Sequence, residues 1–221
     1  MMPAMPITDI DAFIRANTEI ARPALVPELR LHLATEITPL WQATEKTLAE
    51  GNLPPPFWAF PWAGGQALAR HVLDHPEIVR GRRVLDFAAG SGLVALAAAH
   101  AGAAEVTAVE IDAFAEAAMR LNAALNGLTI TPLCSDIVGQ PQPGLDVLLV
   151  GDICYERPLA ERVMAWLKAL SATGTTVLMG DPGRTYLPKQ GLEALATYTV
   201  PTSRELEDRE IRETTVWRVP A

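Results

Sequence analysis

The sequence contains little cysteine and histidine, and this scarcity argues against metal and disulfide chemistry. Of its 221 residues only two are cysteine, Cys134 and Cys154, and both lie in apolar surroundings without ligand spacing. We therefore expect two reduced thiols buried in the core of a cytoplasmic protein. His71 and His75 lie four residues apart, but no third ligand accompanies them. No metal site is predicted.

Long apolar runs and an excess of basic charge are also missing. The runs at 93–99 and 145–150 are too short to cross a bilayer, and the first six residues lack the pattern of a signal peptide. Eighteen basic residues against 26 acidic ones give a net charge of −8. This balance argues against a nucleic-acid binder and fits a basic protein partner. We expect a monomer that binds neither nucleic acid nor membrane.

Alternating strand and helix patterns begin at Arg82. Such alternation predicts an α/β fold, a parallel sheet with helices on both faces. Two later β-rich segments, separated by the charged stretch Ser203–Glu210, predict an antiparallel pair at the end of the sheet. The predicted strands are 82–87, 105–110, 129–134, 145–151, 175–180, 196–201 and 212–219, and the predicted helices are 92–101, 113–125 and 157–170.

The N-terminal part has a different pattern. Thr8 with Asp11 indicates a helix start of the capping-box type, and alternating leucines at 29–33 indicate a half-buried strand. Residues 51–62 are rich in proline and aromatics, which predicts a rigid, irregular connector before a helix at 64–73. We therefore expect an N-terminal helix-and-strand extension, residues 1–56, packed on a main domain of residues 57–221.

The most informative segment is an apolar strand that ends near Asp86 and runs into a loop of small residues. Gly90 and Gly92 allow the backbone to approach a ligand closely, and the next helix presents free N–H groups there. A nucleoside cofactor is the natural occupant. Ala88 stands where the commonest form of such loops has its first glycine. Because alanine prefers negative φ, we expect a negative φ there.

Acidic residues follow several predicted strands, where ligands bind in open α/β sheets. Glu110 is placed to accept hydrogen bonds from both hydroxyls of a ribose. Asp136 is placed to accept a hydrogen bond from the amine of an adenine that lies between Ile111 and Ile137. Acidic groups in this number would repel a pyrophosphate and suit a cofactor that carries a cation. The strand-end acids are Asp86, Glu110, Asp112, Asp136 and Asp152.

Together these features resemble the class I S-adenosylmethionine-dependent methyltransferases, which have a Rossmann-like sheet. Within that class, Gly151–Glu156 (GDICYE) looks like the D-x-x-Y motif of a protein-lysine methyltransferase branch. Val177–Arg184 (VLMGDPGR), Phe57–Leu68 (FWAFPWAGGQAL) and Thr214–Trp217 (TTVW) fit the same branch. The chain is thereby similar to the electron transfer flavoprotein β-subunit lysine methyltransferases over nearly its whole length.

The resemblance implies that residues 57–221 bind S-adenosylmethionine and methylate a lysine of the electron transfer flavoprotein beta subunit. A free lysine has a pKa near 10.4, so the site must supply its neutral amine. The resemblance implies catalytic roles for Asp152 and Tyr155. The implied cofactor-binding residues are Asp86, Ala88, Gly90, Gly92, Glu110, Ile111, Asp136, Ile137 and Trp62, and the implied substrate-binding residues are Phe60, Glu156 and Arg184.

Other readings of the same residues stay open at this point. In one alternative, the chain is a class I methyltransferase whose acceptor is another protein, such as a ribosomal protein, or a small amine. In another alternative, the Rossmann-like site is degenerate and the chain is a non-catalytic nucleotide-binding module. An NAD-dependent oxidoreductase fits less well, because Asp136, the antiparallel tail and the lack of a second domain are not typical of one.

Overall fold

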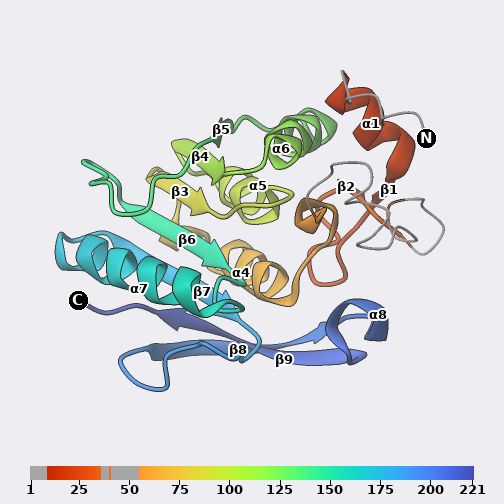
Figure 1. Ribbon diagram of the computed structural model, residues 1–221. Coiled ribbons are helices and arrows are strands. Elements are labelled where there is room, and N and C mark those ends of the chain that lie inside the picture. The colour runs from red at the N-terminus through yellow and green to blue at the C-terminus, as the bar shows by residue number, and fades with distance from the viewer. Residues whose placement is uncertain (1–8, 36–39, 41–54) are drawn as a thin grey trace, which may run out of the picture.

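The computed structural model describes residues 9–35, residue 40 and residues 55–221. A seven-stranded sheet has the order β5-β4-β3-β6-β7-β9-β8 (Figure 1). Strands β5 to β7 in that order are parallel, and β9 is antiparallel to both β7 and β8. The predicted fold is confirmed. The strands are β3 (Arg83–Phe87), β4 (Glu105–Glu110), β5 (Thr131–Cys134), β6 (Val147–Gly151), β7 (Thr176–Asp181), β8 (Glu193–Pro201) and β9 (Ile211–Arg218).

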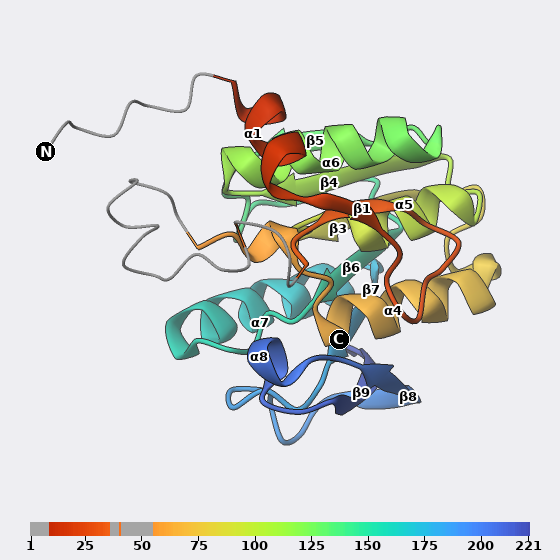
Figure 2. The ribbon, with the colours of Figure 1, turned by 90° about the vertical axis from the view of Figure 1, so that its right-hand side faces the viewer.

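Helices cover both faces of this sheet. Figure 2 shows α7 on one face and α4, α5 and α6 on the other. Because both faces are covered, the central strand β6 is almost continuously apolar, and alternate apolar residues of β3 and β6 enter separate cores. Val84 and Leu149 pack on the α4–α5 side, whereas Leu85 and Leu148 pack on the α7 side. The helices are α4 (Ala63–Asp74), α5 (Leu93–His100), α6 (Ala113–Asn126) and α7 (Arg157–Ala172).

The N-terminal segment packs mainly on α6. Helix α1 (Ile10–Asn17) is followed by a two-stranded hairpin of β1 (Glu19–Ala21) and β2 (Leu31–Leu33). A third apolar cluster joins Ile14 of α1 to Leu121 of α6 and includes Trp58. The division into 1–56 and 57–221 stays a prediction.

Three local expectations differ from the structure. The N-cap of α1 is Asp9, whose Oδ1 accepts a hydrogen bond from Ala12 N at 2.9 Å. The expected cap, Thr8, lies outside the described residues. Asp112 is a helix cap rather than an open strand-end acid, because its carboxylate accepts a hydrogen bond from Phe114 N. Cys134 is exposed, since β5 is an edge strand, whereas Cys154 is buried as predicted.

Short elements complete the fold. The aromatic connector forms a 3-10 turn, η1 (Phe57–Ala59), and a second turn, η2 (Pro76–Ile78), follows α4. Within the charged stretch before β9 lies a helix, α8 (Arg204–Glu207), which the sequence analysis did not predict. None of the helices among the described residues is long and apolar enough to cross a membrane.

Candidate functional site

The candidate site lies at the carboxyl ends of the parallel strands. From β3 the sheet extends to β4 and β5 on one side and to β6 and β7 on the other. This reversal of strand order is where open α/β sheets bind ligands. The loop between β3 and α5 therefore sits at the centre of the site.

This loop has an unusual backbone. Ala88, Gly90 and Gly92 all have positive φ, at 54°, 51° and 78°. The expectation of a negative φ at Ala88 is wrong, because neighbouring hydrogen bonds fix the turn. Ala89 N donates to Val109 O at 3.1 Å, and Gly92 N donates to Ala89 O at 2.7 Å.

The two glycines have different surroundings. A Cβ added at Gly92 would come within 3.0 Å of Met119 Cγ on α6, so this glycine serves helix packing. A Cβ at Gly90 would meet only the Trp58 backbone, at 3.8 Å. Gly90 therefore faces the more open side of the loop.

Asp86 is buried beneath the loop. Its side chain is 1% exposed, and Oδ2 accepts a hydrogen bond from Ala95 N of α5 at 2.8 Å. Burial raises the pKa of this carboxyl to about 8, and the nearby Glu110 charge adds to the effect. A pKa of about 8 favours the protonated form of this carboxyl at neutral pH.

Glu110, at the end of β4, faces the same loop. One carboxylate oxygen accepts from Ile111 N at 2.8 Å, and the other accepts from Gly90 N at 3.3 Å. Each oxygen thus keeps one acceptor position, the number that a pair of adjacent hydroxyls requires. Burial raises the pKa of this carboxyl as well.

The predicted adenine contacts follow two neighbouring strands, Ile111 directly after β4 and the pair Asp136 and Ile137 after β5. Ile111 is 74% exposed, whereas Ile137 is buried in the α7-side core. Asp136 is exposed, and its Oδ2 pairs with Arg162 of α7 at 2.7 Å while its Oδ1 accepts from Val138 N. The structure brings Asp136 to the same edge as Glu110, because Ser135 N donates to Glu110 O.

On the other side of the loop, Asp152 joins strands β6 and β7 to helix α4. Its φ is +52°, and its backbone N donates to Gly180 O. Its buried carboxylate accepts a short hydrogen bond from Gly64 N in the first turn of α4. Burial raises the pKa of Asp152 to about 6, against the lowering effect of Arg184.

This junction requires glycine at the contact between α4 and β7. A Cβ on Gly64 would lie 2.3 Å from Gly180 O, and one on Gly180 would lie 2.1 Å from Gly64 O. The helix start therefore rests directly on strand backbone, which explains glycines in both family-like segments.

Aromatic rings from the connector before α4 and from the segment after β6 lie close together. Tyr155 is about half exposed, and its ring centroid lies 6.2 Å from that of Phe57. Trp62 contacts both Phe57 and Phe60 edge to face, at 6.1 and 5.9 Å. Phe60 and Trp62 also line a groove of about 510 Å³ beside the β1–β2 hairpin and Glu207. Glu156 is exposed at the start of α7, and its carboxylate does not cap that helix.

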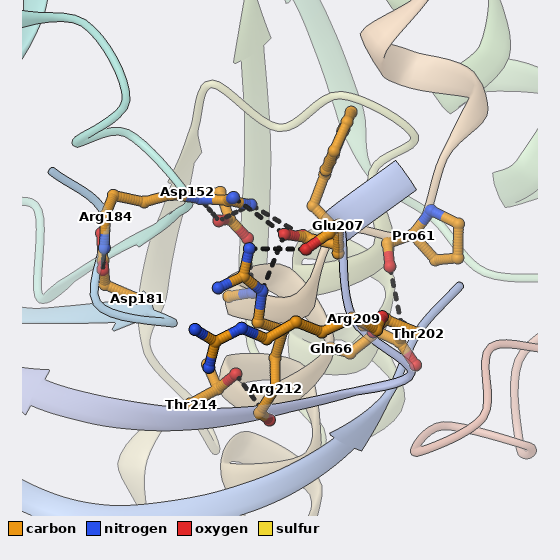
Figure 3. A network of polar contacts seen from close by, with 12 residues as sticks. Pro61, Gln66, Asp152, Asp181, Arg184, Thr202, Glu207, Arg209, Arg212 and Thr214 are labelled. Carbon is orange, nitrogen blue, oxygen red and sulfur yellow. Dashed lines mark hydrogen bonds and ion pairs between the residues drawn. The ribbon is translucent and has the colours of Figure 1, made fainter. Parts of the chain in front are cut away.

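Arg184 and Glu207 complete the site from the C-terminal part of the chain (Figure 3). Arg184 Nε donates to Asp152 Oδ1 at 2.8 Å, and its two terminal nitrogens bind the two oxygens of Glu207 at 2.8 and 2.7 Å. Glu207 was not among the predicted site residues, because it lies within a charged stretch that is typical of an exposed segment. Its only signal was a cluster of both charge signs between two predicted strands.

One further group near the site, the Cys154 thiol, is chemically quiet. Burial raises the pKa of the Cys154 thiol to about 12, so it stays neutral. Within the described residues, no group of three or more His, Cys, Asp or Glu side chains could hold a metal ion.

Comparison with known proteins supplies the context for this geometry. The family model described as ribosomal protein L11 methyltransferase (PrmA) matches residues 67–179. The electron transfer flavoprotein beta subunit lysine methyltransferase of Danio rerio is 39% identical over 217 residues, covering 95% of this chain and 83% of that protein. The Homo sapiens protein of the same name is 36% identical, covering 95% of this chain and 81% of its own. A solved structure of magnesium protoporphyrin IX methyltransferase from Synechocystis PCC 6803 with bound SAM is 16% identical, has a TM-score of 0.52 and covers 70% and 77% of the two chains, which shows a shared fold.

Proposed function

Because this chain belongs to the electron transfer flavoprotein beta subunit lysine methyltransferase family, we propose that it methylates lysine on that subunit with S-adenosylmethionine. The observation that carries the proposal is this likeness over nearly the full chain. The site supplies the matching chemistry, a nucleoside cradle beside a buried carboxylate and exposed aromatic rings.

The residues present fit S-adenosylmethionine. The open side of Gly90 gives room for close approach, and Glu110 keeps two acceptor positions for ribose hydroxyls. Asp86 offers a buried carboxyl that a nearby cation would ionise. We propose that Asp136, Ile111 and Ile137 surround the adenine and that Ala88, Gly92 and Trp62 shape the cradle.

When bound, the cofactor supplies a methyl group on a cationic sulfur, and this group passes to the neutral lysine amine. Asp152 Oδ1 is used by Arg184, whereas Oδ2 accepts, among the described residues, only from Gly64 N. One acceptor position therefore remains on Oδ2 for an N–H of the lysine amine. Asp152 would orient the amine or pass its proton to water, and Tyr155 would form a wall of the channel.

The aromatic rings favour a long, cationic side chain as the acceptor. Phe57, Trp62 and Tyr155 present apolar faces for the lysine stem and attract a cation. We propose that Phe60 and the adjoining groove hold the protein segment around the lysine, with Glu156 near its path. The cytoplasmic location and monomeric state expected from the sequence stay predictions.

A labelled-methyl assay tests the function. Purified electron transfer flavoprotein incubated with the wild-type chain and labelled S-adenosylmethionine should gain label on lysine of its beta subunit. The variant Asp152→Asn should lower this rate by about a hundredfold, because the amine loses its charged acceptor.

The control is Asp146→Asn at the opposite end of β6, where the carboxylate binds Arg83 N. It should label the substrate at the wild-type rate. Ribosomal protein L11, the substrate named by the matching family model, serves as the competing acceptor. Label on L11 with none on the flavoprotein would show that the proposed substrate is wrong.

A further inference from the structure

The ionic cluster behind Asp152 extends into the C-terminal hairpin, well beyond the D-x-x-Y motif. Glu207 of α8 is 3% exposed, yet it carries a carboxylate between two guanidinium groups. It binds Arg184 with both oxygens and pairs with Arg212 Nε at 3.3 Å. Arg212 also donates to the backbone carbonyl of Glu207 at 2.6 Å, so the side chain and main chain are both held.

All three guanidinium nitrogens of Arg184 make contacts within this cluster. Nε and one terminal nitrogen bind Asp152 Oδ1 at 2.8 and 2.7 Å, and both terminal nitrogens bind Glu207. Its guanidinium also lies 5.9 Å from the Trp62 ring. Three of its five N–H groups donate hydrogen bonds, and one terminal nitrogen also lies in ion-pair contact with Asp152. Little capacity is left for the substrate contact expected from the sequence.

We infer that Glu207 is a positioning residue for methyl transfer, acting through Arg184 on the carboxylate of Asp152. A planar guanidinium gripped on one edge by two carboxylate oxygens has a fixed plane and direction. Its other edge then holds Asp152 Oδ1 in place, so that Oδ2 points to both Gly64 N and the acceptor amine. The inference rests on the proposed function, since it assigns Glu207 a part in the same site.

The charges around Asp152 allow positioning to be separated from general stability. Arg184 favours its ionised form, whereas the negative charges of Glu207 and Asp181 oppose it. Cys154 adds a neutral thiol, and from α4 the contact described is the backbone N–H of Gly64. Removing the charge of Glu207 while keeping its shape should therefore let Asp152 ionise at lower pH.

The test is Glu207→Gln in the full chain, assayed by labelled methyl transfer to electron transfer flavoprotein. Glutamine keeps one acceptor for Arg184 but loses the two-oxygen grip, so we expect kcat to fall at least tenfold. The affinity for S-adenosylhomocysteine, measured by calorimetry, should stay within twofold of wild type, because Gly90 and Glu110 are untouched. In the plot of log(kcat/KM) against pH, the acid limb, where the rate falls as Asp152 is protonated, should move to lower pH.

Two companion variants guard against a loss of folding. Glu213→Gln on β9 removes a carboxylate that binds only Thr199 in the described contacts, and it should behave as wild type. Glu207→Asp restores the negative charge and should return the acid limb of the pH profile to its wild-type position. This inference alone would be overturned if Glu207→Gln had the wild-type rate. It would also be overturned if the acid limb of that variant's pH profile stayed at the wild-type pH or moved to higher pH. A wild-type chain that labels no lysine would overturn the proposed function, and this inference with it.

Discussion

At the scale of single residues, Asp86 is a buried carboxyl whose pKa lies far above its ordinary value. A carboxyl with a pKa of about 8 in the fold and near 3.8 when unfolded holds its proton only in the folded state. Its contribution to stability is therefore fully present below about pH 4 and is lost as the pH rises through about 8. Asp152 also loses a stabilising contribution as the pH rises from its ordinary pKa to about 6.

The variant Asp86→Asn should remove the larger of these two effects. Asparagine resembles the protonated acid and can still accept from Ala95 N. Relative to wild type, the variant should gain about 2 kcal/mol or more in unfolding free energy between pH 5 and pH 8. Urea unfolding of both proteins at the two pH values measures this difference. Parallel changes in the two proteins would mean that Asp86 is ionised in the fold.

Ala88 shows why single-residue rules can mislead. The preference of alanine for negative φ amounts to only about 1–2 kcal/mol, and the hydrogen bonds of Ala89 and Gly92 outweigh it. The position of the loop between strand and helix was therefore predicted, but this dihedral angle was not. Cys134 was misjudged for a related reason, because the sequence does not say which strand forms the edge.

At the scale of elements, the contact between α4 and β7 should give alanine substitutions at two adjacent glycines opposite effects on stability. Gly64→Ala would place its Cβ 2.3 Å from Gly180 O, so the helix must move and the cost should be about 3 kcal/mol. Gly65→Ala meets nothing within 4 Å, and the gain in helix propensity should stabilise by about 0.5 kcal/mol. Thermal unfolding of the pair decides. Equal effects of one sign would contradict the close approach of α4 to the strand.

The elements themselves were largely predictable, because their apolar periodicity is strong. The boundaries expected for the helices at 113–125 and 157–170 agree closely with α6 and α7. Strand β1 and helix α8 were missed, since each has only three or four residues and too few apolar positions to show a period. The pairing of Arg184 with Glu207 was beyond sequence reasoning because it depends on how the final hairpin folds over β7.

At the scale of the whole molecule, a cofactor that binds only the folded state must raise its stability. S-adenosylhomocysteine at about 100 times its Kd should add about 2.7 kcal/mol, which corresponds to a rise in Tm of roughly 5–10 °C for a chain of this size. Differential scanning fluorimetry measures the shift, and Glu110→Ala should show less of it at the same concentration. A comparable shift with NADH, and none with S-adenosylhomocysteine, would restore the oxidoreductase reading.

The place of β9 in the sheet has a consequence for how the chain is made. β9 lies between β7 and β8, although it is the last strand in the sequence. While the ribosome is still synthesising the chain, the edge of β7 has no neighbour and Arg184 has no Glu207. The nucleoside cradle from β3 to β5 can assemble early, but the acceptor side can close only after the final strand has emerged.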